Sequence, residues 1–315
     1  MPASSLPTPW IVAGALLVEG IVGWPRRLSH PVVWIGGVIA ILERRWNGAA
    51  GSARRRRALG VLTVVILLVV TSTAGWGVQR LVAASPFWPG LALLLIAGAT
   101  GLAARSLFDH VHAVARPLAA GDLPAARRTV GMIVGRDVEA MGEGEVAAAA
   151  LESLAESFCD GVVAPVFWFV VGGLPGLFAY KAVNTADSMI GHMEPRWRAF
   201  GWAAARTDDL MNWIPARIAG TLIALGGWQG WRIMWRDAGK HASPNAGWTE
   251  AAMAGALRVR LGGPVRYDGV MTPRPDFGDW APPRAHDLKR GLRVYGVACA
   301  VLMSLLILGG LLWPR

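Results

Sequence analysis

Long segments without a charged residue most constrain what this chain can fold into. Five windows contain no Asp, Glu, Lys or Arg, and they are Pro2–Val18, Ala58–Gln79, Leu81–Ala104, Gly161–Tyr180 and Val294–Pro314. A helix needs about 20 apolar residues to cross the hydrocarbon core of a bilayer, so at least four windows are long enough. In the third window, Pro86 and Pro89 place the start of the helix near Phe87. The windows predict an all-α, polytopic helical membrane protein with about four to six spans.

The composition agrees with a protein that is embedded in lipid. Of the 315 residues, 54% are hydrophobic and 17% are charged, whereas soluble domains carry about 25% charged residues. The first window lacks the basic segment that begins a secretory signal, because no Lys or Arg precedes Arg26. We therefore interpret this window as an uncleaved span.

Positive charge is concentrated beside the apolar windows. The net charge is +10, and residues 25–57 contain eight Arg against the single acidic residue Glu43. Lys and Arg accumulate in the cytoplasmic loops of membrane proteins, so this loop is predicted to be cytoplasmic. Arg54–Arg57 is then a topology anchor, and no nucleic-acid partner is expected.

Two further segments have the composition of cytoplasmic loops. Residues 105–158 are predicted to be helical, with an Ala-rich stretch that is broken at Pro117 and Pro124 and a helix over Glu145–Phe158. Residues 232–293 hold eleven Lys or Arg against six Asp or Glu, which again favours the cytoplasm.

Because both of these loops are predicted to be cytoplasmic, the chain between them must cross the membrane an even number of times. Two full spans, near residues 161–180 and 213–231, satisfy this condition, and so do broken or re-entrant segments. The Gly-Gly-Leu-Pro-Gly run at 172–176 and Pro215 favour broken segments, which are tolerated where the irregular backbone is buried or lines a cavity. We expect one membrane domain over residues 1–315, in the bacterial inner membrane.

Three carboxylates share one face of a predicted helix. Glu152, Glu156 and Asp160 recur at intervals of four residues. Like charges at this spacing destabilise a helix by a few tenths of a kcal/mol unless a cation lies between them. Oxygen ligands on one face suit Mg²⁺ that carries the phosphates of a nucleotide. The alternative is a solvated face that pairs with arginines, but Asp160 enters an apolar run, where a charge is costly.

A second polar face follows the fourth apolar window. Lys181, Asn184, Asp187 and Ser188 lie at positions i, i+3, i+6 and i+7. Directly after an apolar run, such side chains need polar partners or water, which is typical of a functional site. The alternative is structural, with Lys181 snorkelling to the interface and Asn184 capping a helix.

A third polar group leads into the next apolar segment. Asp208, Asp209 and Asn212 precede it, and Arg217 lies within it. Either aspartate suits a plain N-cap, whereas Arg217 is expected to meet an anion. The sequence contains no P-loop, nucleophile elbow or dinucleotide fingerprint, so any nucleotide site is built in another way.

These polar residues belong to a series of motifs that runs along most of the chain. The motifs are His30-Pro31-Val32, Trp34-Ile35-Gly36, Gly135-Arg136-Asp137, Glu152-Ser153-Leu154-Ala155-Glu156, Asp160-Gly161-Val162-Val163-Ala164-Pro165, Tyr180-Lys181-Ala182-Val183-Asn184-Thr185-Ala186-Asp187-Ser188-Met189, Ala205-Arg206-Thr207-Asp208-Asp209, Asn212-Trp213-Ile214-Pro215-Ala216-Arg217, Ser243-Pro244-Asn245-Ala246-Gly247 and Ala251-Ala252-Met253-Ala254-Gly255-Ala256-Leu257. In this order they resemble the CobD/CbiB family of cobalamin-biosynthesis proteins, the adenosylcobinamide-phosphate synthases.

The chain departs from that family's pattern at a few positions. An Asp and a Gly-Asp-Pro usually stand near the end of the first span, where this chain has Glu19 and Gly23-Trp24-Pro25. This puts a role for that carboxylate turn in doubt. Ser157, Thr249 and Arg258 replace an Asn, a Pro and a Gly of the pattern, and these changes look peripheral.

The resemblance implies a ligase reaction. The chain would join adenosylcobyric acid to (R)-1-aminopropan-2-ol or its O-phosphate, forming an amide on the free propionate of the corrin. A carboxylate is a poor electrophile, and the implied route activates it with ATP and Mg²⁺ through an acyl phosphate. Such chemistry asks the protein for positioning and charge neutralisation. The lipid bilayer and other late cobalamin-assembly enzymes are the expected partners.

The resemblance also implies roles for the polar residues. Catalysis is assigned to Asp137, Lys181, Asn184, Asp208 and Asp209, with either Asp208 or Asp209 taking the proton of the amine. Substrate and phosphate binding is assigned to His30, Arg136, Ser188, Asn212, Arg217 and Asn245. Metal binding is assigned to Glu152, Glu156, Asp160 and Asp187.

Other classes of membrane protein also place charges among apolar helices. A transporter does so on broken helices, but the sequence has no internal repeat and residues 181–217 are long. A prenyltransferase-like enzyme uses acidic clusters around Mg-diphosphate, and a demand for ATP with an amine would separate it from the ligase. A non-catalytic membrane sensor of the same fold would show no turnover.

Overall fold

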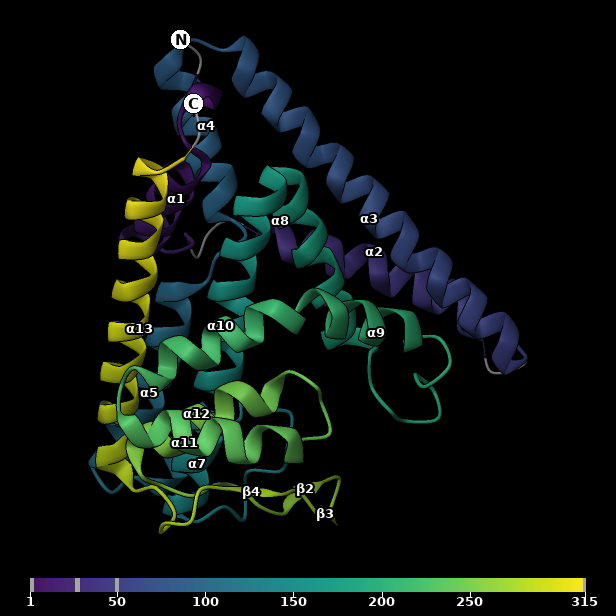
Figure 1. Cartoon of the computed structure of the whole chain (residues 1–315). Coiled ribbons are helices and arrows are strands. Elements are labelled where there is room, and N and C mark those ends of the chain that lie inside the picture. The colour runs from purple at the N-terminus through teal and green to yellow at the C-terminus, as the bar shows by residue number, and fades with distance from the viewer. Residues whose placement is uncertain (1–2, 26–28, 49–50, 314–315) are drawn as a thin grey trace. The chain divides into compact units, whose positions relative to one another are not determined.

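The computed structural model describes residues 3–25, 29–48 and 51–313. Arg26 and Arg27 of the predicted basic loop lie outside the described residues, as do the outer ends of the first and last apolar windows, Pro2 and Pro314. Figure 1 labels the helices and strands of the chain, which divides into two compact units. The first comprises residues 1–103, 164–212 and 306–315, and the second comprises residues 104–163 and 213–305.

The described residues contain four helical stretches that are long and apolar enough to cross a membrane. They are Ala53–Ala84, Phe87–Ala119, Glu143–Ile190 and Ala285–Leu311. Two apolar helices are shorter, namely Thr8–Val22 and Trp213–Ala224. The prediction of an all-α, polytopic membrane protein is confirmed, and the helix of the third window begins at Phe87 as expected.

The first unit is built around helix α8. Its helices are α1 (Thr8–Val22), α2 (Pro31–Trp46), α3 (Ala53–Ala84), α4 (Phe87–Ala99), α8 (Ala164–Ile190) and α9 (Trp202–Met211), preceded by a short 3-10 helix over Ala3–Ser5. Helices α1, α2, α3, α4 and α9 all contact α8. Ile39 of α2, Leu67 of α3, Ile190 of α8 and Phe200 pack into one buried cluster.

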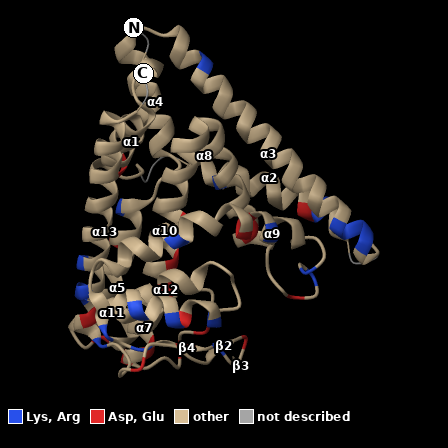
Figure 2. Ribbon diagram, in the orientation of Figure 1, with Lys and Arg blue, Asp and Glu red and all other residues tan. Residues whose placement is uncertain are grey.

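The run Arg54–Arg57 lies at the start of helix α3. The hydroxyl of Ser52 caps this helix by accepting a hydrogen bond from the backbone N–H of Arg55, at 3.3 Å. The blue segment at this end of α3 in Figure 2 is the run Arg54–Arg57, and most of the remaining helix is uncharged. At 1.5 Å per residue its 32 residues extend about 48 Å, enough to cross the roughly 30 Å hydrocarbon core.

Helix α8 is broken at Gly173. This residue has φ 61° and ψ −154°, a backbone conformation that is essentially open to glycine alone. A Cβ at this position would lie 2.6 Å from Nε2 of Gln79 on α3. Pro175, two residues later, lacks the N–H that a regular helix would use. The break predicted over residues 172–176 is confirmed.

The second unit is also helical. Its helices are α5 (Ala104–Ala119), α6 (Leu123–Val130), α7 (Glu143–Phe158), α10 (Trp213–Ala224), α11 (Trp228–Asp237), α12 (Ala246–Leu257) and most of α13 (Ala285–Leu311), with a π-helical turn over Cys159–Val163 and a 3-10 helix over Ala238–Lys240. Helix α12 contacts α7, α10 and α11. Helix α7 is capped by Glu145, whose carboxylate accepts the N–H of Gly142 at 2.6 Å.

The Ala-rich stretch breaks later than predicted. Pro117 lies inside the last turn of α5, where its ring removes only one helical hydrogen bond. The chain leaves the helix after Ala119, and Gly121 adopts φ 75°. Asp122 then caps α6 by accepting the N–H of Ala125 at 2.9 Å, and Pro124 lies in the first turn of α6 and not at the break.

Residues 213–231 do not form one full span. Helix α10 ends at Ala224, and α11 begins at Trp228 after a turn through Gly226 and Gly227. The 12 residues of α10 extend about 18 Å, which is short of the roughly 30 Å hydrocarbon core. The interpretation as broken segments therefore holds over the interpretation as two full spans.

Two small antiparallel ribbons lie between α12 and α13, and the sequence analysis did not predict them. Strand β1 (Leu261–Gly262) pairs with β4 (Asp276–Phe277), and β2 (Val265–Tyr267) pairs with β3 (Val270–Thr272). Asp268 and Gly269 form the two-residue turn between β2 and β3, both with positive φ, as a type I′ hairpin turn requires.

Candidate functional site

In the first unit, a buried group of hydrogen bonds joins α8 to the end of α9. The hydroxyl of Tyr180 donates to Oδ1 of Asn212 at 3.0 Å, and Nδ2 of Asn212 donates to Asp208 at 2.9 Å. The amide of Asn184 reaches the other oxygen of Asp208 at 3.4 Å, and Nζ of Lys181 donates to Oδ1 of Asn184 at 3.4 Å. The predicted residues Lys181, Asn184, Asp208 and Asn212 thus meet in one polar centre.

Asp208 is the ionisable group at the middle of this centre. Burial raises its pKa from 3.8 to about 6, while hydrogen bonds from Asn212 and Asn184 oppose the rise. Burial also raises the pKa of Asp209, and the guanidinium of Arg206, at 2.9 Å, lowers it. Both aspartates lie inside α9, so neither is the N-cap that was the structural alternative.

The remaining predicted residues of the first unit are His30, Ser188 and Asp187, and each makes a local hydrogen bond. Nδ1 of His30 accepts the N–H of Val32 at 3.2 Å and caps α2. Burial and the positive charge of Lys181 lower the pKa of His30, which favours the neutral ring. The hydroxyl of Ser188 donates to the carbonyl of Asn184 at 2.9 Å. The backbone carbonyl of Asp187, the residue before Ser188, accepts the N–H of Gly191 at 2.7 Å.

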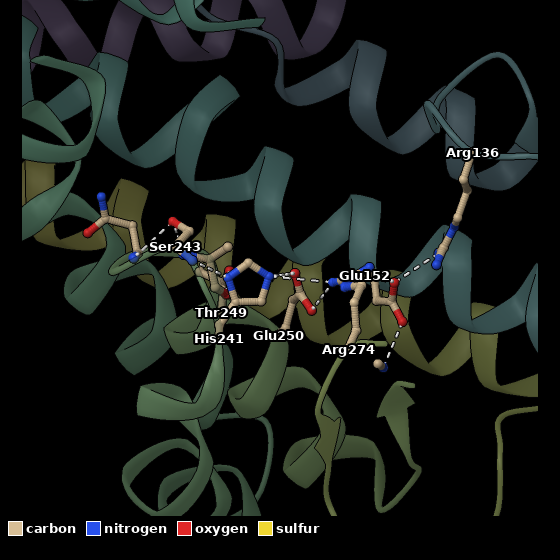
Figure 3. A network of polar contacts seen from close by, with 10 residues as sticks. Arg136, Glu152, His241, Ser243, Thr249, Glu250 and Arg274 are labelled. Carbon is tan, nitrogen blue, oxygen red and sulfur yellow. Dashed lines mark hydrogen bonds and ion pairs between the residues drawn. The ribbon is translucent and has the colours of Figure 1, made fainter. Parts of the chain in front are cut away.

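In the second unit, two arginines and two glutamates form a second network (Figure 3). Arg136 donates to Oε2 of Glu152 at 2.9 Å, and the backbone N–H of Gly262 donates to Oε1 at 2.8 Å. Arg274 bridges Oε2 of Glu152 at 3.4 Å and Oε2 of Glu250 at 3.2 Å. The side chains of Glu152 and Glu250 are 5% and 2% exposed, so these charges are removed from water.

Helix α12 and the loop before it contribute the acidic end of this network. Burial raises the pKa of Glu250, and the nearby Glu152 and Glu156 raise it further, against the opposing effect of Arg274. Nε2 of His241 lies 3.7 Å from Oε1 of Glu250, and its Nδ1 accepts the N–H of Ser243 at 2.9 Å. Burial and Arg274 lower the pKa of His241, which favours the neutral ring.

Two cavities adjoin this network. The smaller has a volume of about 190 Å³ and is lined by Arg136, Glu152, Glu250 and Arg274, among others. The larger has a volume of about 550 Å³ and is lined by the backbone and side chains around α7 and the ribbons. Arg136 and Glu152 line both cavities and therefore form a charged wall between them.

Asp137 holds the β2–β3 hairpin. Its carboxylate accepts the N–H of Gly269 at 2.8 Å, and its own N–H donates to the carbonyl of Arg266 at 3.0 Å. Tyr267 of this hairpin lines the smaller cavity. The catalytic role predicted for Asp137 stays a prediction, and the structure shows it as a positioning contact.

Arg217 does not meet an acidic side chain among the described residues. Its guanidinium lies over the indole rings of Trp213 and Trp248, 4.4 Å and 4.7 Å from their centroids. It donates to the carbonyl of Trp213 at 2.5 Å and to Oδ1 of Asn245 at 3.4 Å. The expected anion is replaced here by aromatic faces, which also attract a guanidinium, and the predicted residues Arg217 and Asn245 are in contact.

Comparison with known proteins agrees with these motifs. The model of one family, described as CobD/Cbib protein, matches residues 12–295. The chain is 48% identical to "Cobalamin biosynthesis protein CobD" of Rhodobacter capsulatus, covering 95% of this chain and 96% of that protein. Proteins of the same name from Geobacter metallireducens and Brucella suis are 43% and 42% identical, over 93% and 96% of this chain and 94% and 96% of their own lengths.

This chain belongs to the CobD/CbiB family of cobalamin-biosynthesis proteins. No solved structure matches it. The family assignment predicted from the motifs is confirmed, and the membrane character of the chain agrees with its four apolar helices in the described residues.

The magnesium ion implied by the CobD/CbiB family has carboxylates available in both units. Glu152 is engaged by two arginines and a backbone N–H, so it is poorly suited to a metal as the network stands. Among the described residues, no group of three or more His, Cys, Asp and Glu side chains is placed to hold a metal. Mg²⁺ that arrives with phosphates needs only one or two protein carboxylates, and metal binding by Glu156, Asp160 and Asp187 stays a prediction.

Sequence reasoning missed the residues that complete the second network. Glu250 is the only charged residue between Ala246 and Leu257, so the argument that drew attention to Asp160 in an apolar run would have found it. In the first unit, the role of Tyr180, at the end of an apolar window, was also missed. Arg274 lies in a Pro-rich loop, and nothing in its local sequence indicates that it reaches two buried glutamates.

Proposed function

We propose that this chain is the amide-forming ligase of its family, joining an aminopropanol or its O-phosphate to the free propionate of adenosylcobyric acid with consumption of ATP. The observation that carries this proposal is the pair of adjoining cavities in the second unit, which share Arg136 and Glu152 as one wall. A ligase must bring a small amine and larger charged substrates to one place, and adjoining cavities of unequal size suit that task.

The first requirement of the reaction is to bind anionic substrates. The larger cavity, at about 550 Å³, lies in the size range of ligand pockets and is lined by Arg136, Arg260 and Arg266. Guanidinium groups bind carboxylate and phosphate oxygens through several donors at once. These three arginines would hold phosphates or the corrin carboxylate in place and neutralise their charge.

The second requirement is to take a proton from the amine, which is mostly protonated at pH 7 and then carries no lone pair. A carboxylate with a pKa raised toward neutrality suits this task. Asp208, in the centre around Lys181, has this property, with a pKa of about 6. Burial also raises the pKa of Glu250, in the network with Arg274. The positions of Lys181 and Asn184 support the ionised form of Asp208 by charge and hydrogen bonding.

Activation of the substrate carboxylate by ATP would be assisted by Mg²⁺, which neutralises phosphate charge when bound. Glu156 and Asp160 are the residues that we propose to hold it in the second unit. They lie one helical turn apart, and Asp160 belongs to the π-helical turn, a feature that is frequent at functional sites. Asp187 stays a predicted ligand in the first unit.

A direct assay tests the proposed function. The full chain, purified in detergent, would be incubated with adenosylcobyric acid, ATP and either amine, and the corrinoid products would be separated by mass. The expected product is adenosylcobinamide or its phosphate, formed together with ADP. Absence of both products with active substrates would refute the ligase. Uptake of a corrinoid into vesicles without any amide product would instead favour a transporter.

A further inference from the structure

Exposed arginines gather at one end of the first unit (Figure 2). They come from the end of α2, the start of α3 and the segment between α8 and α9. We call them the basic patch, and its members are Arg44, Arg45, Arg54, Arg55, Arg57 and Arg196. The proposed function uses none of these residues.

Hydrogen bonds hold the three segments of the basic patch together. The buried carboxylate of Glu43 on α2 accepts two hydrogen bonds from the guanidinium of Arg196, at 3.0 Å and 3.3 Å. The backbone carbonyl of Arg196 accepts one from the side chain of Asn47 at 3.2 Å and a longer one from Arg56 at 3.5 Å. The arginines are therefore brought together by the fold and not only by their order in the sequence.

The basic patch carries more positive charge than its own segments neutralise. Residues 43–57 and 194–198 contain eight Arg and two Glu, an excess of six positive charges. One of these glutamates, Glu43, is 6% exposed and is already paired with Arg196. Like charges at close range repel each other, so the patch attracts anions.

The position of the basic patch along α3 places it beside the lipid headgroups. The uncharged window Ala58–Gln79 begins directly after Arg57, and α3 is one of the helices that are long and apolar enough to cross a membrane. When this window occupies the hydrocarbon core, Arg54–Arg57 lies at the edge of the core, where the headgroups begin. The anion that is abundant at this level is the phosphate of a lipid.

Indole rings beside the arginines support the same level. The guanidinium of Arg57 lies 5.0 Å from the ring centroid of Trp202, which is 42% exposed, and that of Arg196 lies 4.5 Å from the ring centroid of Trp197. Tryptophan is enriched at the membrane–water interface because its ring is apolar and its N–H is polar. The basic patch and its indoles thus match a layer of headgroups next to acyl chains.

We propose that the basic patch binds the phosphates of anionic phospholipids. A guanidinium donates to several phosphate oxygens at once, and basic clusters directly next to a spanning helix are attracted to anionic lipid. Phosphatidylcholine carries a cation beside its phosphate, so the patch favours phosphatidylglycerol over it. The inference is independent of the proposed ligase activity.

Native mass spectrometry of the full chain in detergent tests this inference. The chain would be mixed with equal amounts of phosphatidylglycerol and phosphatidylcholine that carry the same acyl chains, and the bound lipids would be counted. We expect the parent to retain phosphatidylglycerol at least about five-fold more than phosphatidylcholine. Inorganic phosphate at the same concentration should not displace the lipid, because it lacks the acyl chains that keep a headgroup beside the patch.

Two pairs of substitutions remove charge from different helices of the basic patch. Arg54→Gln with Arg55→Gln changes α3, and Arg44→Gln with Arg45→Gln changes α2, so either pair tests the patch if the other fails to fold. Both pairs should lose most of the preference for phosphatidylglycerol. Arg54→Lys with Arg55→Lys keeps the charge and should keep most of the preference.

A control pair of the same net charge separates the basic patch from charge in general. Arg128→Gln with Arg232→Gln removes two exposed charges from the second unit and should behave as the parent. Equal retention of both lipids by the parent, or an unchanged preference in either folded pair of the patch, would overturn the inference. It would also be overturned by an equal loss in the control pair, which would reflect net charge alone, or by displacement of the lipid by inorganic phosphate. None of these measurements requires amide formation, so the inference can fail while the ligase stands, and the reverse.

Discussion

At the scale of single residues, the buried carboxylate of Asp208 makes the stability of the fold depend on pH. Asp208 is 9% exposed and accepts hydrogen bonds from two asparagine amides. Its pKa of about 6 means that, between about pH 4 and 6, the folded chain holds a proton that the unfolded chain has released. Stability therefore falls as pH rises through this window and stays lower above it.

Asp208→Asn removes the buried charge, so the variant should not share this loss of stability. We expect the melting temperature of the variant, minus that of the parent, to be larger at pH 8 than at pH 5. The measurement is thermal unfolding of the purified chain in detergent at both pH values, with the exposed Glu139→Gln as control. A difference that is the same at both pH values, or larger at pH 5, would show that Asp208 is not a strained buried carboxylate.

Two carboxylates on one helical face test the proposed role of magnesium. Glu156→Gln and Asp160→Asn each keep the shape of the side chain and remove one ligand charge. Loss of one electrostatic contact to a reacting group typically lowers turnover on the order of 10²–10³-fold. If the lost group is a ligand, raising Mg²⁺ should restore part of the activity by mass action. Turnover like that of Glu139→Gln at every Mg²⁺ concentration would remove both residues from the metal site.

At the scale of elements, the β2–β3 hairpin is held to the rest of the second unit by few contacts. All residues of β3 are exposed, and two hydrogen bonds connect Asp137 to the hairpin, one to Gly269 and one from its own N–H to Arg266. Tyr267 of the hairpin lines the smaller cavity. An element with exposed backbone and few buried contacts opens locally at low free energy.

Asp137→Ala should loosen this hairpin without unfolding the unit. The substitution removes the side-chain hydrogen bond to Gly269, which is worth roughly 0.5–1.5 kcal/mol. We expect amide hydrogen exchange to become several-fold faster over residues 265–272 and to stay unchanged in α7 and α12. If the variant and the parent exchange at the same rate over residues 265–272, or if exchange rises equally in the hairpin, α7 and α12, Asp137 does not position the hairpin.

At the scale of the whole molecule, the charge pattern predicts which loops face the cytoplasm. The Arg-rich segment before α3 and the basic residues of 232–293 both indicate the inner side. Single cysteines at Ser52 and Val270, in a chain without Cys159 and Cys299, should both resist an impermeant thiol reagent in intact cells and react after permeabilisation. Labelling of Val270→Cys alone in intact cells would require an odd number of crossings between the two sites.

The local signals in the sequence were strong enough to determine the membrane class, the family and several helix ends. The membrane class follows from the uncharged windows. The start of α4 at Phe87 follows from the preceding proline, and the break in α8 follows from Gly173 and Pro175. Each of these effects is local to a few residues. The Asp268-Gly269 turn of the β2–β3 hairpin is a signal of the same kind, and it was overlooked among the surrounding glycines and prolines.

Only the tertiary structure decided which charged residues meet. Lys181 and Asn184 are in contact within α8, and Asp208 and Asn212 are in contact at the end of α9. The contact between the two pairs, however, depends on how α9 packs against α8. Arg274 reaches Glu152 across 122 positions of the chain, and no local pattern carries such a distance. Helical periodicity assigns a residue to a face of its own helix, whereas the partner of a buried charge is set by the packing of distant segments.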